Sequence, residues 1–191
     1  MSLSSKEYSE TEMPSLNEPC RLTRHTPKNH RITGSLYTCA RPGRSIGRNY
    51  ARISDEMVEA WILGMPSSTD EIIIVSLLGR KPNQLSEFSY YSFRGGFDRP
   101  EDRPGCPTWQ EWLTERYGSK YKVCEFPTVD TELIHEHTKR RVANTILESV
   151  RSGKTVVLVD SGGVGRTGSV ISTIKKMGLE LSEQLMTLRC P

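Results

Sequence analysis

A buried-strand pattern that runs directly into a glycine-rich turn constrains the fold of this chain more than any other feature. The segment is VVLVDSGGVGRTGSV, residues 156–170. Its first four residues are apolar and mostly β-branched, which is typical of a strand covered on both faces. Gly162, Gly163 and Gly165 follow, and they allow positive φ angles that turn successive backbone N–H groups into one concavity. The segment therefore predicts a strand, an anion-holding turn and a helix in direct succession.

Apolar patterns elsewhere in the chain predict strands that alternate with helices. We expect strands within residues 31–42, 71–79, 120–127 and 155–159, and helices within 53–64, 108–118, 131–151, 167–178 and 181–189. Alternation of this kind is typical of parallel sheets, because the helices serve as crossovers between the strands. The sequence thus predicts an α/β fold with a largely parallel central sheet flanked by helices.

Composition limits the number of domains and the classes of partner. A chain of 191 residues is long enough for one well-buried domain. Residues 1–30 are polar and lack an apolar period, so we expect a flexible N-terminal segment ahead of one domain over 31–191. The net charge of +3 is too small for a nucleic-acid binder, and no apolar run reaches the ~20 residues of a membrane span. The start of the chain also lacks the apolar core of a signal peptide.

The five cysteines give no sign of a disulfide framework or a zinc site. They are Cys20, Cys39, Cys106, Cys124 and Cys190, an odd number with no C-x-x-C spacing. Free thiols favour a reducing compartment, so we expect a cytoplasmic protein. His135 and His137 would lie on different faces of the helix expected there, so we expect no metal site. No motif indicates a cofactor.

Arg166 gives the glycine turn its chemistry. Its guanidinium is a planar fork that matches two phosphate oxygens, and it stands at the start of the predicted helix. A nucleotide-binding loop of the form G-x-x-x-x-G-K-[ST] would need glycine at position 160 and lysine at position 166. The chain has Asp160 and Arg166 there, so a nucleotide-binding loop is disfavoured.

The stretch SGGVGRTG, Ser161–Gly168, resembles the signature loop H-C-x5-R-[ST] of the cysteine-dependent protein phosphatases, in their dual-specificity-like branch. The segment FPTVD lies about thirty residues upstream, where that family has its general-acid loop. GSLYTCARP and IIIVSLLG resemble the opening of such domains. The resemblance covers residues 31–190 and implies the tyrosine and dual-specificity phosphatase fold. It also implies hydrolysis of phosphomonoesters through a phosphocysteine intermediate.

The resemblance implies a role for each residue of the loop. Phosphate binding would fall to the backbone of Ser161, Gly162, Gly163, Val164, Gly165 and Arg166, and to the Arg166 guanidinium. Thr167 would hydrogen-bond toward the nucleophile, and Asp130 would protonate the leaving oxygen. From the residues alone, Asp130 can also be the N-cap of the helix over 131–151. The implied partner is a phosphoprotein or phosphopeptide, with a phospholipid or phosphosugar as the alternative, and neither metal nor cofactor is needed.

Two positions depart from the family pattern. Asp160 stands where the family has its nucleophilic cysteine, and Val159 stands where it has histidine. A carboxylate cannot follow thiolate chemistry, and aspartyl-phosphate enzymes normally use a metal held by further carboxylates, none of which is near Asp160 in the sequence. Asp160 would also repel a bound phosphate by ~4 kcal/mol at ~4 Å and an effective dielectric near ~20. The Asp160 carboxylate can instead accept hydrogen bonds from the loop amides and from the Arg166 side chain.

Two interpretations of Asp160 therefore stay open. In the first, the chain is a phosphatase in which aspartate has replaced the cysteine, and it is inactive as written. In the second, it is a natural pseudophosphatase that acts as a phospho-recognition or scaffold module. The sequence favours neither strongly, because the lost histidine points to natural decay whereas the intact loop and Asp130 point to a single replacement.

Overall fold

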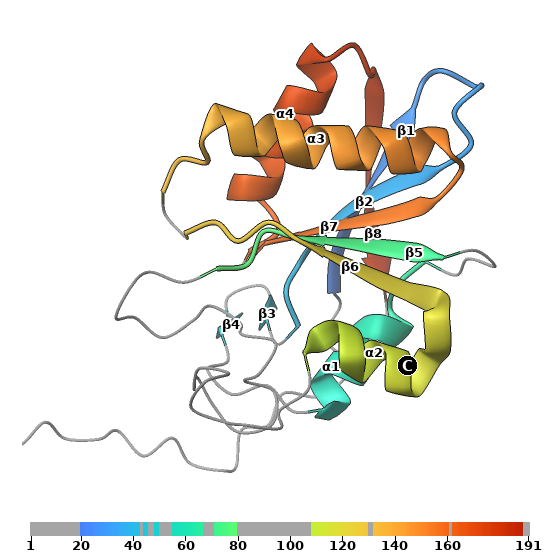
Figure 1. Cartoon of the computed structure of the whole chain (residues 1–191), viewed down its shortest axis with the longest axis vertical. Coiled ribbons are helices and arrows are strands. Elements are labelled where there is room, and N and C mark those ends of the chain that lie inside the picture. The colour runs from blue at the N-terminus through green and yellow to red at the C-terminus, as the bar shows by residue number, and fades with distance from the viewer. Residues whose placement is uncertain are drawn as a thin grey trace, which may run out of the picture.

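Strands and helices alternate through most of the chain and build one mixed β-sheet with helices against both of its faces (Figure 1). The computed structural model describes residues 20–42, 44–45, 48–49, 55–66, 71–79, 108–129, 132–160 and 162–188. The strands are β1 (Cys20–Pro27), β2 (Ser35–Ala40), β3 (Arg44–Ser45), β4 (Arg48–Asn49), β5 (Ile72–Ser76), β6 (Tyr121–Glu125), β7 (Thr155–Asp160) and β8 (Leu181–Leu188). The helices are α1 (Asp55–Leu63), α2 (Trp109–Tyr117), α3 (Glu136–Arg151) and α4 (Gly165–Lys176), with a 3-10 turn, η2, at Gly118–Lys120. Within these ranges no helix is both long and apolar enough to cross a membrane.

Four neighbouring strands form the parallel part of the sheet. The order across the sheet is β6-β5-β7-β2-β1-β8, and β3 and β4 form a separate pair. Pairing is parallel from β6 to β2, and β1 is antiparallel to both β2 and β8. The predicted α/β sheet with flanking helices is confirmed, but the sheet is mixed, and the predicted parallel pairing holds only from β6 to β2. β7 lies between β5 and β2, and the carboxyl end of a strand in such a position is where open sheets bind ligands.

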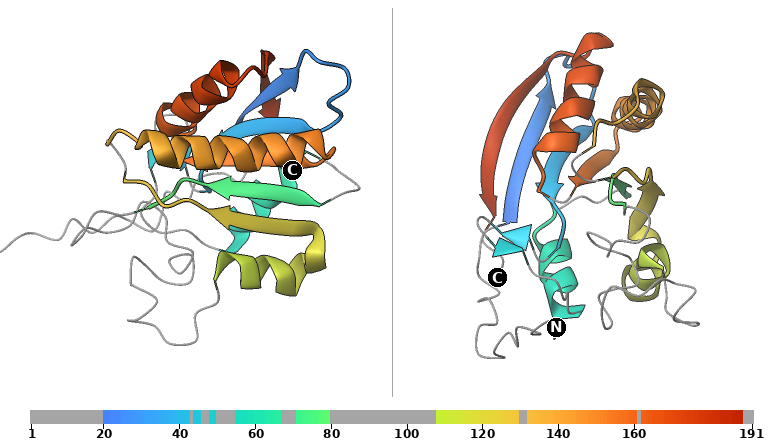
Figure 2. Two further views of the ribbon diagram at one scale, coloured as in Figure 1. Left: turned by 45° about the horizontal axis from the view of Figure 1, so that its top comes forward. Right: turned by 90° about the vertical axis from the view of Figure 1, so that its left-hand side faces the viewer.

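The apolar run of β7 is buried because helices cover both faces of the sheet (Figure 2). Val157 and Val159 pack in the cluster that contains α1 and α2 residues. Val156 and Leu158 pack in the cluster that contains α3 and α4 residues. Successive strand residues point to opposite faces, so a doubly covered strand requires an unbroken apolar sequence. The sequence prediction of a buried strand at this place is confirmed.

Two sequence predictions are wrong at one edge of the sheet. Residues 20–27 form β1 rather than part of a flexible segment, and residues 181–188 form β8 rather than a helix. The two strands pair along their whole length, with eight residues of each in register. Leu, Glu, Gln and Met favour a helix in isolation, but the ladder to a distant strand outweighs that local preference. Residues 1–19 of the predicted flexible segment lie outside the described residues.

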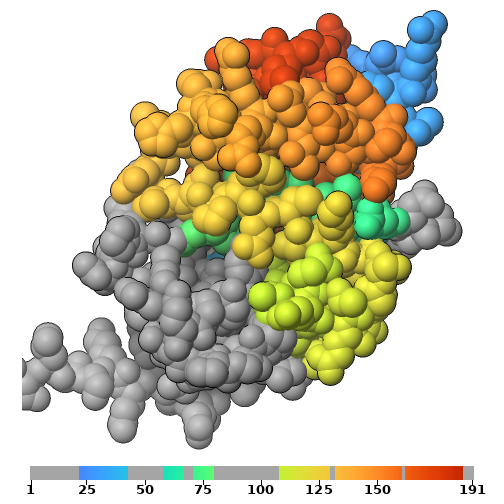
Figure 3. Space-filling model, viewed as in Figure 1, coloured from blue at the N-terminus to red at the C-terminus, as the bar shows by residue number. Residues whose placement is uncertain are grey.

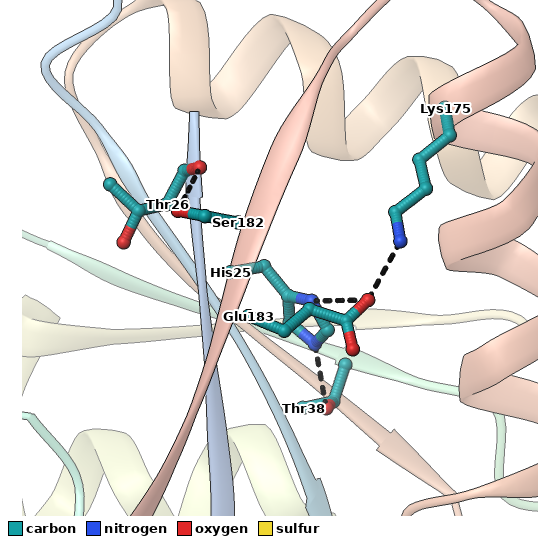
Figure 4. Close-up of polar contacts among 6 residues, drawn as sticks. All are labelled: His25, Thr26, Thr38, Lys175, Ser182 and Glu183. Atoms are coloured by element: carbon teal, nitrogen blue, oxygen red, sulfur yellow. Dashed lines mark hydrogen bonds and ion pairs between the residues drawn. The ribbon is translucent and has the colours of Figure 1, made fainter. Parts of the chain in front are cut away.

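A polar cluster joins α4 to three strands at this edge (Figure 4). His25 on β1 is buried, and its Nε2 atom lies 3.0 Å from Thr38 Oγ1 on β2. Its Nδ1 atom lies 3.8 Å from Glu183 Oε1 on β8, and the same oxygen accepts a 2.7 Å hydrogen bond from Lys175 Nζ on α4. Burial lowers the pKa of His25 below its ordinary value, and the nearby Glu183 charge opposes this only in part. The fold therefore favours the neutral form of His25.

We predict that the fold loses stability in mild acid because His25 must take up a proton. The ordinary histidine pKa is 6.5 and the folded pKa is lower, so the unfolded state binds the proton first as the pH falls. The free energy of unfolding should be highest above pH ~6.5 and should fall by up to ~1.4 kcal/mol per pH unit below it. Urea unfolding, followed by circular dichroism from about pH 7.5 to about pH 5, measures this slope.

The matched control for this prediction is His25→Gln, which keeps a polar side chain that cannot titrate. The loss of stability with falling pH should be smaller in this variant than in the unchanged chain. The same slope in both proteins would show that other titrating groups, rather than His25, cause the loss.

Candidate functional site

The parallel strands β2, β5 and β7 end side by side, and polar side chains are buried at this carboxyl-terminal edge of the sheet, which is distinct from the β1–β8 edge described above. The buried polar residues at this edge are Arg41, Ser76, Asp160, Arg166 and Thr167. Asp160 is the last residue of β7 and is only 2% exposed. Its carbonyl oxygen accepts a 2.9 Å hydrogen bond from the Arg41 amide, so the end of β7 is fixed against the residue that follows β2. The glycine turn singled out in the sequence begins here.

The Asp160 carboxylate fills the glycine turn. Its Oδ1 atom accepts a hydrogen bond from the Gly163 amide, and its Oδ2 atom accepts a 2.8 Å hydrogen bond from the Thr167 amide. Thr167 is the third residue of α4, so its amide is one of the N–H groups that have no partner within the helix. The turn thus directs two amides at one anionic group, and that group belongs to the chain itself.

Gly163 shapes the turn because a side chain fits neither its backbone angle nor its surroundings. Its φ angle is 70°, in the left-handed region that favours glycine. A Cβ atom on Gly163 would lie 2.5 Å from the Ala40 amide nitrogen and 2.6 Å from the Cys39 carbonyl carbon. Gly162 and Gly165, by contrast, have open space where a Cβ would lie. Of these three glycines, Gly163 is therefore the one that packs on the backbone at the end of β2.

The Arg166 side chain is buried and reaches two backbone carbonyls. Its Nη1 atom donates to the carbonyl oxygens of Leu77 at 3.1 Å and of Thr128 at 2.9 Å. Thr128 also donates to the Leu77 carbonyl, through its amide at 3.2 Å and its hydroxyl at 2.6 Å. Gly79 permits this close approach, since a Cβ there would lie 2.5 Å from the Thr128 carbonyl oxygen. Arg166 therefore fixes the segment after β6 to the end of β5, inside the protein rather than on its surface.

The structure brings together part of the site predicted from the sequence. The predicted residues that it places at the same sheet edge are Asp160, Gly162, Gly163, Gly165, Arg166 and Thr167. Thr167 contacts Asp160 through its backbone amide. Val164 precedes α4 and is 59% exposed. Ser161 and Asp130, to which the family resemblance gives roles in phosphate binding and proton transfer, lie outside the described residues.

The alternative role of Asp130 as the N-cap of the following helix is wrong. α3 begins at Glu136 rather than at Thr131, and its N-cap residue is His135. The apolar period that predicted this helix begins only at Val142, so it defined the C-terminal part of the helix better than its start. The general-acid role of Asp130 does not depend on a cap and stays a prediction.

Sequence reasoning missed Arg41 and Thr128. Arg41 is 3% exposed and follows β2 directly, and its Nη1 atom donates to the Pro42 carbonyl at 2.9 Å. The Thr128 carbonyl accepts a hydrogen bond from the Arg166 side chain, and Thr128 lies within the FPTVD segment. A usable signal was present, because residues that directly follow neighbouring parallel strands must share one edge of the sheet.

Neither a metal-binding group of side chains nor a similarity to known proteins gives a further indication of function. Across the described ranges, no group of three His, Cys, Asp or Glu side chains is arranged to hold a metal ion. No protein-family model matches the chain, and neither curated proteins nor solved structures give a significant match. Function is therefore inferred from the loop residues and their contacts.

We predict that Gly163→Ala destabilises the fold far more than Gly162→Ala. The first substitution places a Cβ against the backbone of β2 in a left-handed conformation, which should lower the free energy of unfolding by at least ~2 kcal/mol. The second places a Cβ in open space and should change it by less than ~0.5 kcal/mol. Chemical denaturation of both variants measures the difference. Equal losses would contradict the packing of the turn on β2.

Proposed function

We propose that this chain is a phosphatase-like domain of the cysteine-dependent tyrosine and dual-specificity class, inactive as written. The turn after β7 would be its phosphate loop, with Asp160 at the position of the nucleophile. The observation that carries the proposal is the pair of hydrogen bonds from the Gly163 and Thr167 amides to the Asp160 carboxylate. These bonds support an oxyanion-binding turn in which a side chain of the chain takes the place of a substrate anion.

With cysteine at position 160, the same amides would favour a thiolate. Hydrogen bonds from Gly163 and Thr167 and the positive end of α4 stabilise a negative charge at this point, which lowers the pKa of a thiol. The thiolate sulfur would attack phosphorus and form a phosphocysteine as the bond from phosphorus to the leaving oxygen breaks. Asp130 would give its proton to that oxygen, and water would then hydrolyse the phosphocysteine to phosphate.

Arg166 would supply the positive charge opposite the transferred phosphoryl group. Its contacts with the Leu77 and Thr128 carbonyls bury the side chain and fix its position at the edge of the sheet where the loop begins. A charge that is fixed before the substrate arrives needs little reorganisation during the reaction. The expected substrate class is a phosphoprotein or phosphopeptide, and no metal takes part in any of these steps.

Asp160 opposes this chemistry in two ways. Its carboxylate already accepts the amides that a substrate phosphate would need. It would also repel the phosphate by ~4 kcal/mol at ~4 Å and an effective dielectric of ~20, which corresponds to an affinity up to about a thousandfold lower. Both effects make the chain as written a poor binder of phosphate at this loop.

A natural pseudophosphatase that acts as a phospho-recognition or scaffold module is the second candidate. The amide contacts of Asp160 weigh against recognition of a phosphate by this loop in the chain as written. They are compatible with a scaffold role that uses other surfaces. The two candidates differ in whether a cysteine at position 160 is enough to produce turnover.

We predict that Asp160→Cys hydrolyses a small aryl phosphate without added metal, whereas the unchanged chain and Asp160→Ser do not. Serine is close to cysteine in size and also removes the carboxylate, but its hydroxyl stays protonated and supplies no thiolate. Release of the phenolate, followed by absorbance in the presence of EDTA, measures the turnover. The serine variant is thus the matched control for every effect of the substitution except nucleophilicity.

A further control tests the loop in the cysteine variant. Arg166→Lys keeps the charge but loses the planar fork, so kcat of the Asp160→Cys protein should fall by about a hundredfold. If Asp160→Cys stays inert while circular dichroism shows a folded chain, the phosphatase proposal fails and the scaffold candidate is favoured. Turnover by the unchanged chain in EDTA would contradict both candidates.

We predict that Asp160→Ser gains affinity for inorganic phosphate. The substitution releases the Gly163 and Thr167 amides and removes the repelling charge. Added phosphate should therefore raise the Tm of Asp160→Ser more than that of the unchanged chain. At a phosphate concentration ten times the dissociation constant, the gain in free energy of unfolding should be roughly 1.4 kcal/mol. Thermal unfolding with sodium chloride at equal ionic strength is the control. An equal rise in both proteins would place the phosphate elsewhere.

A further inference from the structure

A second polar site lies between α3 and α4, whose surfaces adjoin on the face shown in Figure 3. It is a groove with a volume of about 570 Å³. Its lining residues belong to these two helices, except for Met177, which directly follows α4. The residues of the glycine turn do not line it. The groove is therefore separate from the site at Asp160.

α4 presents a stripe of hydroxyl and ammonium groups to this groove. Ser169, Ser172, Thr173 and Lys176 line it, and residues spaced by three and four lie on one face of a helix. The buried apolar residues of α4 occupy a different face, which packs on the sheet. The polar stripe is thus the part of α4 that core packing does not use.

Three cations surround one carboxylate in the groove. α3 contributes Glu136, Lys139 and Arg140, and α4 contributes Lys176. Lys139 Nζ forms an ion pair with Glu136 Oε1. The pKa of Glu136 is held below its ordinary value, first by the hydrogen bond from Lys139 and then by the charges of Lys139, Lys176 and Arg140. The groove keeps an excess of positive charge after this one internal pair is formed.

Hydrogen-bond donors outnumber acceptors among the lining side chains. Within the part of the chain that the structure describes, no hydrogen bond or ion pair engages the side chains of Arg140, Asn144, Ser169, Ser172 and Lys176. Together they offer a guanidinium, an ammonium, an amide and two hydroxyls. The one carboxylate nearby is already bound to a lysine. A ligand that fits must therefore supply acceptor oxygens and negative charge.

We propose that this groove binds a small, multiply charged phosphate anion. A phosphate monoester has several acceptor oxygens and a charge of about −2 at neutral pH, which matches a donor-rich groove with an excess of cations. Arg140 can engage two oxygens through its planar fork, and Lys176 adds a point charge from the opposite helix. A volume of about 570 Å³ suits a metabolite-sized ligand. A free phosphorylated metabolite and a phosphoinositide headgroup share this chemistry.

Calorimetric titration of the full chain with inorganic tripolyphosphate at low ionic strength tests the groove. Arg140→Gln and Lys176→Gln should each weaken binding by about tenfold, because each removes a charge-assisted contact. The matched controls are Arg151→Gln at the other end of α3, and Lys175→Gln, whose ammonium pairs with Glu183 instead. Both controls should bind within about twofold of the unchanged chain. No binding, or equal losses in groove and control variants, would overturn the proposal.

Two further probes identify the source of the phosphate. Inositol trisphosphate represents a free metabolite, and vesicles that contain phosphatidylinositol bisphosphate represent a lipid headgroup, with phosphatidylcholine vesicles as the control. Retention on the phosphoinositide vesicles that is lost in Lys176→Gln supports the lipid source. Binding of the soluble anions alone supports the free metabolite. Failure of the tripolyphosphate, the inositol phosphate and the vesicles together overturns the proposal.

The test separates the groove from the loop. In the unchanged chain the Asp160 carboxylate occupies the loop amides, so the titration reports on other sites. An affinity that changes in Asp160→Ser but not in Arg140→Gln would place the anion in the loop. That outcome would overturn the groove and leave the proposed function standing, whereas inert Asp160→Cys would have no bearing on the groove.

Discussion

The two hydrogen bonds that the Asp160 carboxylate accepts from Gly163 and Thr167 hold together the parts on which any function of the loop depends. They join the last residue of a central strand to the first turn of α4. Bonds to a charged group contribute about 1.5–3 kcal/mol each. The carbonyl of the same residue accepts the Arg41 amide, so both the backbone and the side chain of Asp160 are engaged. Asp160 thus links the end of β7 to the residue after β2 and to the first turn of α4.

Arg166 adds a second constraint, because its guanidinium donates hydrogen bonds to the backbone carbonyls of Leu77 and Thr128. An exposed arginine loses rotamer freedom when it binds a ligand, whereas a buried one has lost that freedom already on folding. The Thr128 carbonyl that holds it lies two residues before Asp130 in the sequence. The hydrogen bond between Arg166 and the Thr128 carbonyl therefore ties the cation expected to bind phosphate to the segment expected to supply the general acid.

Local sequence patterns predicted the elements that are covered on a regular face and missed those whose partners are distant. β7 and α3 carry unbroken or periodic apolar residues, so their burial can be inferred from adjacent positions. β1 and β8 pair although nearly the whole described chain separates them in sequence, and neither strand contains a pattern that identifies the other as its partner. In the site, the glycines, Asp160 and Arg166 were recognisable from residue type. The carbonyls of Leu77 and Thr128 were not, because every residue has a carbonyl and only packing selects those that face Arg166.

β8 is synthesised after every other described element, yet it completes the sheet beside β1, the first of them. β1 can pair early with β2 on one side, but its other side lacks a partner until the chain has passed α4. Contacts between residues so far apart form slowly, since chain entropy is lost before they stabilise the fold. During that time the open side of β1 exposes N–H and C=O groups that can pair with another chain. The nascent protein is thus exposed to association with its neighbours on the polysome from the synthesis of β2 until β8 has been made.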